Sequence, residues 1–170
     1  MTRLNMTQRF LWLGSIILTV VLLDQLTKNW IVDWIGPGRR TSRVEMLGSF
    51  FAFEYLENRG AAFGMFQQGT TVFALISVVV IIIGTVMMIR FAREDMLLAA
   101  SVALVMGGAI GNAIDRFTRG FVVDFIAVGR FWKFNVADSA VTIGVIMTFL
   151  LLWRSDNARQ SEESTQEQET

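Results

Sequence analysis

Residues 96–116 read MLLAASVALVMGGAIGNAIDR, and this stretch decides the fold. It carries no charge before Asp115 and is long enough to cross the hydrocarbon core of a bilayer, which needs about 20 helical residues. Small residues recur every four positions along it, at Ala99, Ala103, Gly107 and Gly111. A stripe of this kind lets a neighbouring membrane helix approach closely. We therefore predict a transmembrane helix that packs at short distance against another.

Three further segments have the same length and apolar character. The chain has 170 residues, of which 53% are hydrophobic, and this composition is typical of a membrane protein. We predict one domain over residues 1–154, with transmembrane helices at roughly 10–32, 70–90, 96–116 and 136–154. The polar residues 155–170 predict a disordered tail. An even number of spans places both termini on the same side of the membrane.

The segment between the first two helices differs from the rest. Gly36-Pro37-Gly38 breaks the first helix, and Phe51, Phe53 and Tyr55 then alternate with other residues at the period of a strand. We predict a small antiparallel sheet over about 36–66, at the membrane surface, with its aromatic face towards the acyl region. Residues 117–133 predict a short loop or helix on the same side.

Charge and composition exclude several functions. Net charge is zero and no basic stripe interleaves with aromatic residues, so we expect no nucleic-acid partner. The chain has neither Cys nor His, which removes thiol catalysis, disulfides and Cys-ligated metals, and we expect no metal or cofactor. Six basic residues fall on the terminal side and nine on the other, a raw count that would place the termini outside.

Two aspartates lie at the edges of strongly apolar segments. Asp124 lies in FVVDFI and Asp138 in FNVADSAVTIG. A carboxylate near a bilayer is costly, and a close pair can share a proton and so activate water. The alternative for Asp124 is a loop residue that points to water. The alternative for Asp138 is a capping box with Asn135, which is compatible with a catalytic role.

Other polar residues gather around these segments. Asn112, Asp115 and Arg116 share one helical face, which indicates either a polar site or packing with an interfacial Asp–Arg pair. Asp24 and Lys28 stand four residues apart, in the favourable order for an ion pair that supports a site.

The segment 57–64, ENRGAAFG, leads from the predicted sheet to the second helix. Asn58 offers a donor and an acceptor, and Gly60 and Ala61 give a backbone without bulk against which a peptide or lipid chain could lie. A tight strand-to-helix turn is the alternative.

In this order, DQLTK, ENRGAAFG, GGAIGNAIDR, GFVVDF and FNVADS resemble the motifs of bacterial lipoprotein signal peptidase, or signal peptidase II. The resemblance implies four transmembrane helices with a small extracytoplasmic sheet, cytoplasmic termini and residence in the inner membrane. It implies a monomeric intramembrane aspartic endopeptidase that cuts before the diacylglyceryl-modified cysteine of a prolipoprotein. Membrane lipids and globomycin-like cyclic peptide inhibitors are further implied partners.

The resemblance also assigns roles to single residues. Asp124 and Asp138 match the catalytic dyad. The residues that match substrate-binding or supporting positions are Asp24, Lys28, Asn58, Gly60, Ala61, Gly108, Asn112, Asp115, Arg116 and Asn135.

Two other functions fit the intramembrane acids. A proton-coupled transporter could use Asp24, Asp115, Asp124 and Asp138 as a relay, although we expect these acids to gather at one end of the bundle. A metal-dependent lipid transferase usually needs two aspartates at i, i+4 on one helix, and Asp115 has no such neighbour.

Overall fold

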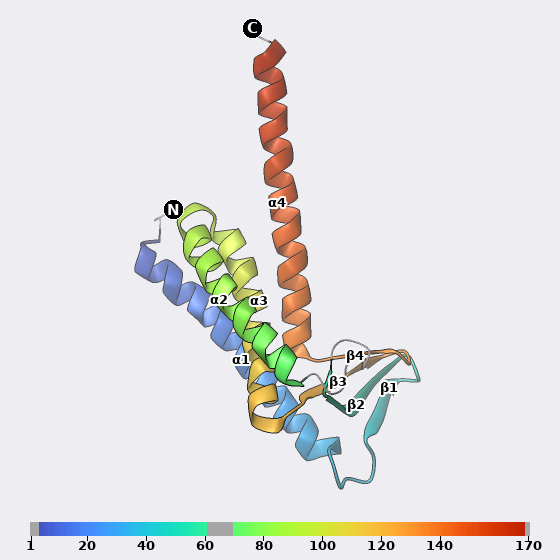
Figure 1. Cartoon of the computed structure of the whole chain (residues 1–170). Coiled ribbons are helices and arrows are strands. Elements are labelled where there is room, and N and C mark those ends of the chain that lie inside the picture. Colours follow the sequence, from blue (N-terminus) through green and yellow to red (C-terminus); the bar gives the residue numbers. More distant parts are fainter. Residues whose placement is uncertain (1–3, 61–69, 169–170) are drawn as a thin grey trace.

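Within residues 4–60 and 70–168, which the computed structural model describes, the chain forms four helices. They are α1 (Met6–Ile35), α2 (Thr70–Glu94), α3 (Met96–Arg119) and α4 (Val136–Gln168). Each contains a segment long and apolar enough to cross a membrane, in α4 as far as Asn157. The prediction of four such helices is confirmed, with ends that extend a few residues further. Figure 1 shows the sheet at one end of the bundle and both termini towards the other.

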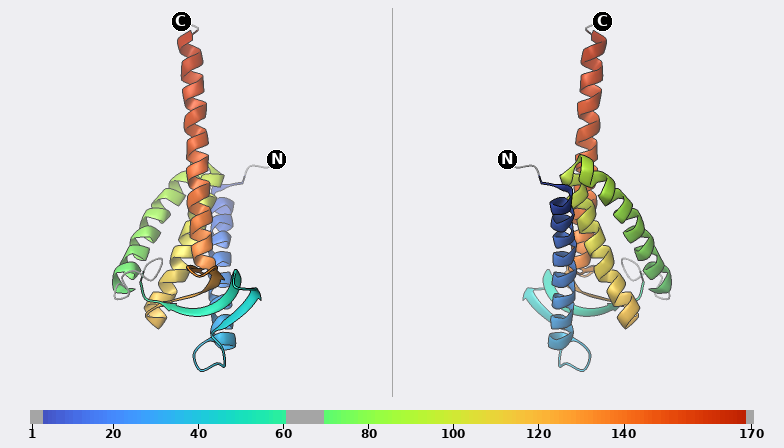
Figure 2. Two further views of the ribbon diagram at one scale, coloured as in Figure 1. Left: turned by 90° about the vertical axis from the view of Figure 1, so that its right-hand side faces the viewer. Right: turned by 90° about the vertical axis from the view of Figure 1, so that its left-hand side faces the viewer.

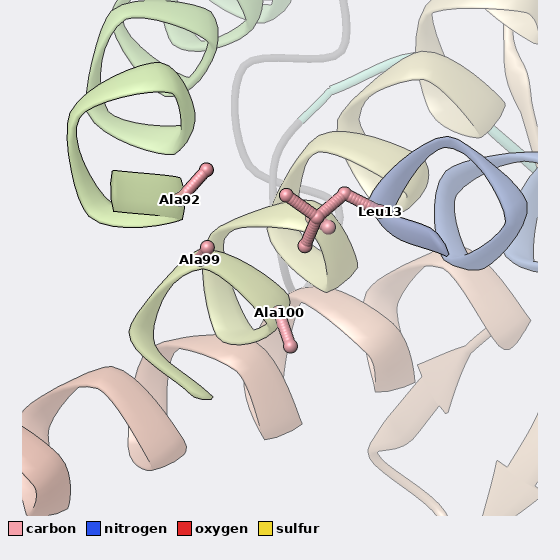
Figure 3. Packing of buried hydrophobic residues seen from close by; sticks show 5 residues of the cluster. Leu13, Ala92, Ala99 and Ala100 are labelled. Atoms are coloured by element: carbon pink, nitrogen blue, oxygen red, sulfur yellow. The ribbon is translucent and has the colours of Figure 1, made fainter. Parts of the chain in front are cut away.

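Helix α3 is the centre of the bundle and contacts the other three helices. Its apolar segment is 72% buried, against 17% in each of the other three. The predicted stripe of small residues faces α1: Leu13 packs beside Ala99 and Ala103, and a Cβ on Gly107 would lie 2.8 Å from Val20 Cβ. Figure 3 shows Leu13 directed from α1 towards α3, next to Ala92 of α2. Small side chains thus set the helix spacing, as predicted.

The sheet has more strands than the sequence predicts. Its order is β1 (Arg43–Leu47), β2 (Phe51–Asn58), β3 (Val122–Val128) and β4 (Trp132–Phe134), with all neighbours antiparallel. The first two strands lie in the predicted segment 36–66. The other two occupy residues expected to form a loop or short helix. Both faces of β3 are largely covered, so its sequence lacks the alternation that marks a half-buried strand.

The aromatic face of the sheet is directed differently from the prediction. Phe53 lies 6.0 Å, between ring centroids, from both Trp30 and Trp34 of α1, and 6.4 Å from Phe125 of β3. Below it, Ile31 and Val123 are fully buried in the same cluster. The end of α1 therefore covers the face that we expected to meet acyl chains. In both views of Figure 2 the sheet wraps across the end of the bundle beside α1.

Two connections between elements are very short. Asp95 alone separates α2 from α3, and its Oδ1 accepts hydrogen bonds from the backbone N–H groups of Leu97 (2.8 Å) and Leu98 (3.2 Å). Asn135 alone separates β4 from α4.

At its C-terminal end α4 continues as a helix to Gln168, where we predicted a disordered tail. Residues 155–168 contain good helix formers and no proline, which is compatible with this continuation.

Candidate functional site

The sheet and the start of α4 bring the two predicted aspartates to one pocket. Asp124 is in the middle of β3, opposite Leu56 of β2, and Asp138 is in the first turn of α4. Both line a cavity of about 570 Å³. The described residues that line it with them are Asn58, Gly60, Asn112, Arg116, Val122, Trp132, Lys133, Phe134, Ser139, Val141, Thr142 and Ile143. The pocket is thus polar at the carboxyls, and the apolar side chains of its wall are Val122, Trp132, Phe134, Val141 and Ile143.

Asp124 is buried, and both of its oxygens accept hydrogen bonds. Only 2% of the residue is exposed, which contradicts the alternative of a loop aspartate pointing to water. Asn58 Nδ2 donates to Oδ2 and Asn135 Nδ2 to Oδ1, each at 2.9 Å. Burial first, and then the charge of Asp138, raises the pKa of Asp124 to about 7, against these two hydrogen bonds and the charge of Lys28.

Asp138 occupies the predicted capping box. Its backbone N–H donates to Asn135 Oδ1 at 2.9 Å, and its Oδ2 accepts from the backbone N–H of Asn135 at 3.2 Å. Its Oδ1 accepts from Asn112 Nδ2 at 2.7 Å. The cap therefore fixes the carboxyl group without using both of its oxygens.

Two amides connect the carboxyl groups. Asn135 Nδ2 donates to Asp124 and also to Asn112 Oδ1, the latter at 3.1 Å. Asn112 Oδ1 also accepts from Lys28 Nζ (3.0 Å), and the NH₂ group of Asn112 is therefore directed to Asp138. Both amides are buried, so their orientations are held by donors and acceptors of the protein.

The predicted ion pair of α1 is present and fully buried. Lys28 Nζ lies 2.8 Å from Asp24 Oδ2 and 3.0 Å from Asp115 Oδ2, and none of the three side chains is exposed. Asp115 thus pairs with Lys28, and at 3.5 Å with Arg119, in place of the Asp115–Arg116 pair that we considered.

The remaining predicted residues lie at or near the pocket wall. The Arg116 guanidinium stands 5.8 Å from the Phe73 ring centroid of α2, and Gly60 N–H donates to Asn58 Oδ1 at 3.0 Å. Gly108 lies under the first turns of α4, where a Cβ would be 2.6 Å from Val141 Cγ2. Ala61 falls outside the described residues.

Sequence reasoning missed two polar residues at the site. Gln25 Nε2 lies 3.1 Å from Asp24 Oδ2 and 3.2 Å from Asp115 Oδ1. Its only sequence signal is its position inside DQLTK. Lys133 lines the pocket and pairs with Glu54 of β2, and this pair was hidden because β3 and β4 were not predicted.

The arrangement is suited to acid–base chemistry on a bound water. Two hydrogen-bonded carboxyls line one cavity, and burial raises the pKa of one of them, Asp124, to about 7. Among the described residues, no group of three or more His, Cys, Asp or Glu side chains could hold a metal ion. The acids predicted for a proton relay gather in one place: Asp24 and Asp115 share Lys28, and they accept hydrogen bonds from the backbone directly before Asp138 and Asp124.

Comparisons with known proteins point to one family. The family model for signal peptidase (SPase) II matches residues 16–154. Lipoprotein signal peptidase of Caldanaerobacter subterraneus subsp. tengcongensis is 42% identical over 141 residues, which are 82% of this chain and 94% of that protein. The enzyme of Streptococcus thermophilus is 36% identical over 143 residues, 83% and 92% of the two chains.

Solved structures are similar over the same extent. One, described as a bacterial membrane enzyme structure by the in meso method, has a TM-score of 0.71 and 31% identity, covering 85% of this chain and 88% of that chain. A second has a TM-score of 0.66 and 32% identity, covering 82% and 91%.

Proposed function

Since this chain belongs to the signal peptidase II family, we propose that it removes the signal peptide from prolipoproteins, with Asp124 and Asp138 as its catalytic dyad. It is a multi-pass membrane peptidase. We further propose that it cuts before a lipobox cysteine that already carries diacylglycerol. The main support for this dyad is that Asp124 and Asp138 line one pocket and that hydrogen bonds through Asn112 and Asn135 join their carboxyl groups.

The proposed reaction needs one proton shared between the two carboxyls. The ionised carboxylate takes a proton from a water molecule, whose oxygen attacks the scissile carbonyl, while the protonated carboxyl donates to the carbonyl oxygen. The tetrahedral intermediate then collapses, the C–N bond breaks, and a proton passes from the dyad to the leaving amine. No acyl-enzyme forms. Because the carboxyls are coupled, their two apparent pKa values belong to the pair.

A gel-shift cleavage assay in detergent micelles tests this function. The substrates are one prolipoprotein with and without its diacylglyceryl group, and the enzymes are wild type, Asp124→Asn and Asp138→Asn. Asp156→Asn, an exposed residue further along α4, is the matched control. We expect the wild type and the control to cleave the lipidated substrate alone, and the dyad variants to bind it without turnover. Turnover by either dyad variant would refute the assignment.

We also propose cytoplasmic termini, an extracytoplasmic active site in the bacterial inner membrane, a monomeric enzyme, and inhibition by globomycin-like cyclic peptides. The arrangement in Figure 1, with both termini away from the sheet, supports opposite sides of the membrane for the termini and the active site, and the family resemblance supports the cytoplasmic side for the termini. The native chain has no cysteine, so single Arg40→Cys and Ser155→Cys variants report the topology cleanly. A membrane-impermeant maleimide should label Arg40→Cys, and not Ser155→Cys, in spheroplasts. The reverse pattern would invert the orientation.

A further inference from the structure

A fully buried ion cluster lies next to the dyad, and none of its three members is among the residues that line the pocket. Lys28 of α1 is placed between the carboxylates of Asp24 and Asp115, at 2.8 and 3.0 Å. All three side chains have no solvent exposure. Taking such charges out of water is costly, and hydrophobic residues of similar volume often stabilise a fold as well or better. Stability alone is therefore a weak explanation for this cluster.

The carboxylates of Asp24 and Asp115 also accept hydrogen bonds from the backbone. Each of the two bonds comes from the residue directly before one aspartate of the dyad. Asp24 Oδ1 accepts from the backbone N–H of Ala137 at 2.9 Å, one residue before Asp138. Asp115 Oδ2 accepts from the backbone N–H of Val123 at 3.0 Å, one residue before Asp124. Each carboxylate thus anchors the backbone next to one member of the dyad.

Gln25 forms a parallel link between the same carboxylates. Its single NH₂ group lies 3.1 Å from Asp24 Oδ2, 3.2 Å from Asp115 Oδ1 and 3.1 Å from the Gly111 carbonyl oxygen. Lys28 therefore joins the carboxylates of Asp24 and Asp115 as a cation, and Gln25 joins the same carboxylates as a neutral hydrogen-bond donor. Lys28 also donates to Asn112, which binds Asp138 directly.

We propose that Lys28 and Gln25, through Asp24 and Asp115, are positioning residues that set the separation of the Asp124 and Asp138 carboxyls. This proposal rests on the proposed function for the identity of the dyad. The strand β3 and the helix α4 are separate elements, connected along the chain through β4 and Asn135, and a bridge between their backbones keeps them at a fixed spacing. Coupling between two carboxyls depends on that spacing, so the bridge determines how far apart their two titration steps lie.

The kinetic test uses Asp24→Asn, Asp115→Asn and the double variant, each checked for folding by size exclusion and thermal melting. An asparagine oxygen can still accept from the backbone N–H, while its pairing with Lys28 weakens. We expect kcat to fall on the order of 100-fold in each single variant, because a displacement of about 1 Å has that effect, with KM close to wild type. The double variant should lose much less than the product of the two single losses, because both changes break one unit.

The shape of the pH profile separates positioning from a merely structural role. Charged groups around the dyad are Asp24 and Lys28 of α1, Asp115 and Arg116 of α3, and Lys133 of β4. A change of charge alone moves both limbs of the kcat profile in the same direction. A loosened bridge brings the two apparent pKa values closer together and narrows the profile. A smaller folded fraction lowers the amplitude and leaves the width unchanged.

Gln25→Met is the second variant, because it leaves all charges in place and removes only the neutral link. Gln25→Met should also narrow the pH profile of kcat, but to a smaller extent than Asp24→Asn. Asp33→Asn, an exposed change on the same helix, is the matched control and should retain the wild-type kcat and profile width.

Infrared titration of the carboxyl groups in detergent supplies a readout that needs no substrate. Asp124→Asn and Asp138→Asn assign the two steps in the wild type. If the wild type fails to cleave prolipoprotein but Asp24→Asn still brings the steps together, the proposed function fails and the bridge stands. If the separation of the steps is unchanged in Asp24→Asn, Asp115→Asn and Gln25→Met, the bridge is refuted, whatever the activity. Independent, multiplying kinetic losses would refute it as well.

Discussion

Replacing Gly108 by alanine should separate α3 from the start of α4. A Cβ at this position would lie 2.6 Å from Val141 Cγ2 and closer still to the Ala137 carbonyl oxygen. Ordinary contacts begin at 3.4 Å, so the contact with Val141 alone requires about 0.8 Å of movement, and the contact with the Ala137 oxygen requires more. The oxygen belongs to the backbone, which cannot rotate away as a flexible side chain does. The first turn of α4 must therefore move, and Asp138 moves with it.

Stability and activity should respond very differently. Overpacking costs about 1–3 kcal/mol, and alanine restores about 1 kcal/mol of helix propensity relative to glycine. The net loss of unfolding free energy is then about 0–2 kcal/mol. A displacement of about 1 Å in a catalytic group can lower the rate on the order of 100-fold, equivalent to nearly 3 kcal/mol in the barrier. Gly108→Ala should thus stay folded and lose most of its kcat.

The assay measures kcat on lipidated prolipoprotein together with the melting temperature in the same detergent. Gly14→Ala on α1 is the control, because among the described residues nothing lies within 4 Å of its added Cβ. We expect the control to retain activity with equal or higher stability. A Gly108→Ala enzyme with wild-type kcat would show that α4 absorbs the added carbon elsewhere, and the argument from helix spacing would be wrong.

Three further outcomes are expected. Burial raises the pKa of Asp124 to about 7, from an ordinary value of 3.8. Between these two pH values the folded protein binds more protons than the unfolded chain, so the free energy of unfolding falls as pH rises through that range. Asp124→Asn lacks this loss, and its melting temperature relative to wild type should be higher at pH 8 than at pH 5. Arg9 Nη1 donates to the Ala92 carbonyl oxygen at 2.8 Å near the end of α2, so Arg9→Met should cost about 1 kcal/mol in denaturant unfolding and leave KM unchanged. Glu54→Gln weakens the hold on Lys133 at the pocket wall and should raise KM more than it lowers kcat, and an unchanged KM would exclude a role for this pair in binding.

Much of the helical bundle was predictable, because the length and apolar character of one continuous segment are enough to indicate a membrane-spanning helix. The spacing of Ala99, Ala103, Gly107 and Gly111 also predicted a close approach, which occurs against α1. The capping box of Asn135 and Asp138 was visible because a helix cap is local in sequence. In each case the relevant partner lies within a few residues or on the same helical face.

Interactions between distant segments were not predictable in the same way. Strand β3 was expected as a loop because its run of apolar residues is covered on both faces and shows no period. Its pairing with β2 brings Asn58 to Asp124, and no local pattern reports such a register. The bond from Val123 N–H to Asp115 uses a backbone donor, which every residue type except proline would supply. The roles of the dyad and its supporting residues stay predictions until the variants are measured.

Asn135 is both the cap of α4 and a donor to Asp124, and this double use limits which residues the position accepts. At an ordinary cap, Ser, Asp and Asn are nearly interchangeable, since each offers an oxygen to the first turn. Here the same side chain must accept from Asp138 N–H and donate to a carboxylate of a neighbouring strand. Serine is shorter and has one donor, and ionised aspartate has none. Replacing Asn135 with either residue would therefore keep a well-capped helix and lose the hydrogen bond from residue 135 to Asp124.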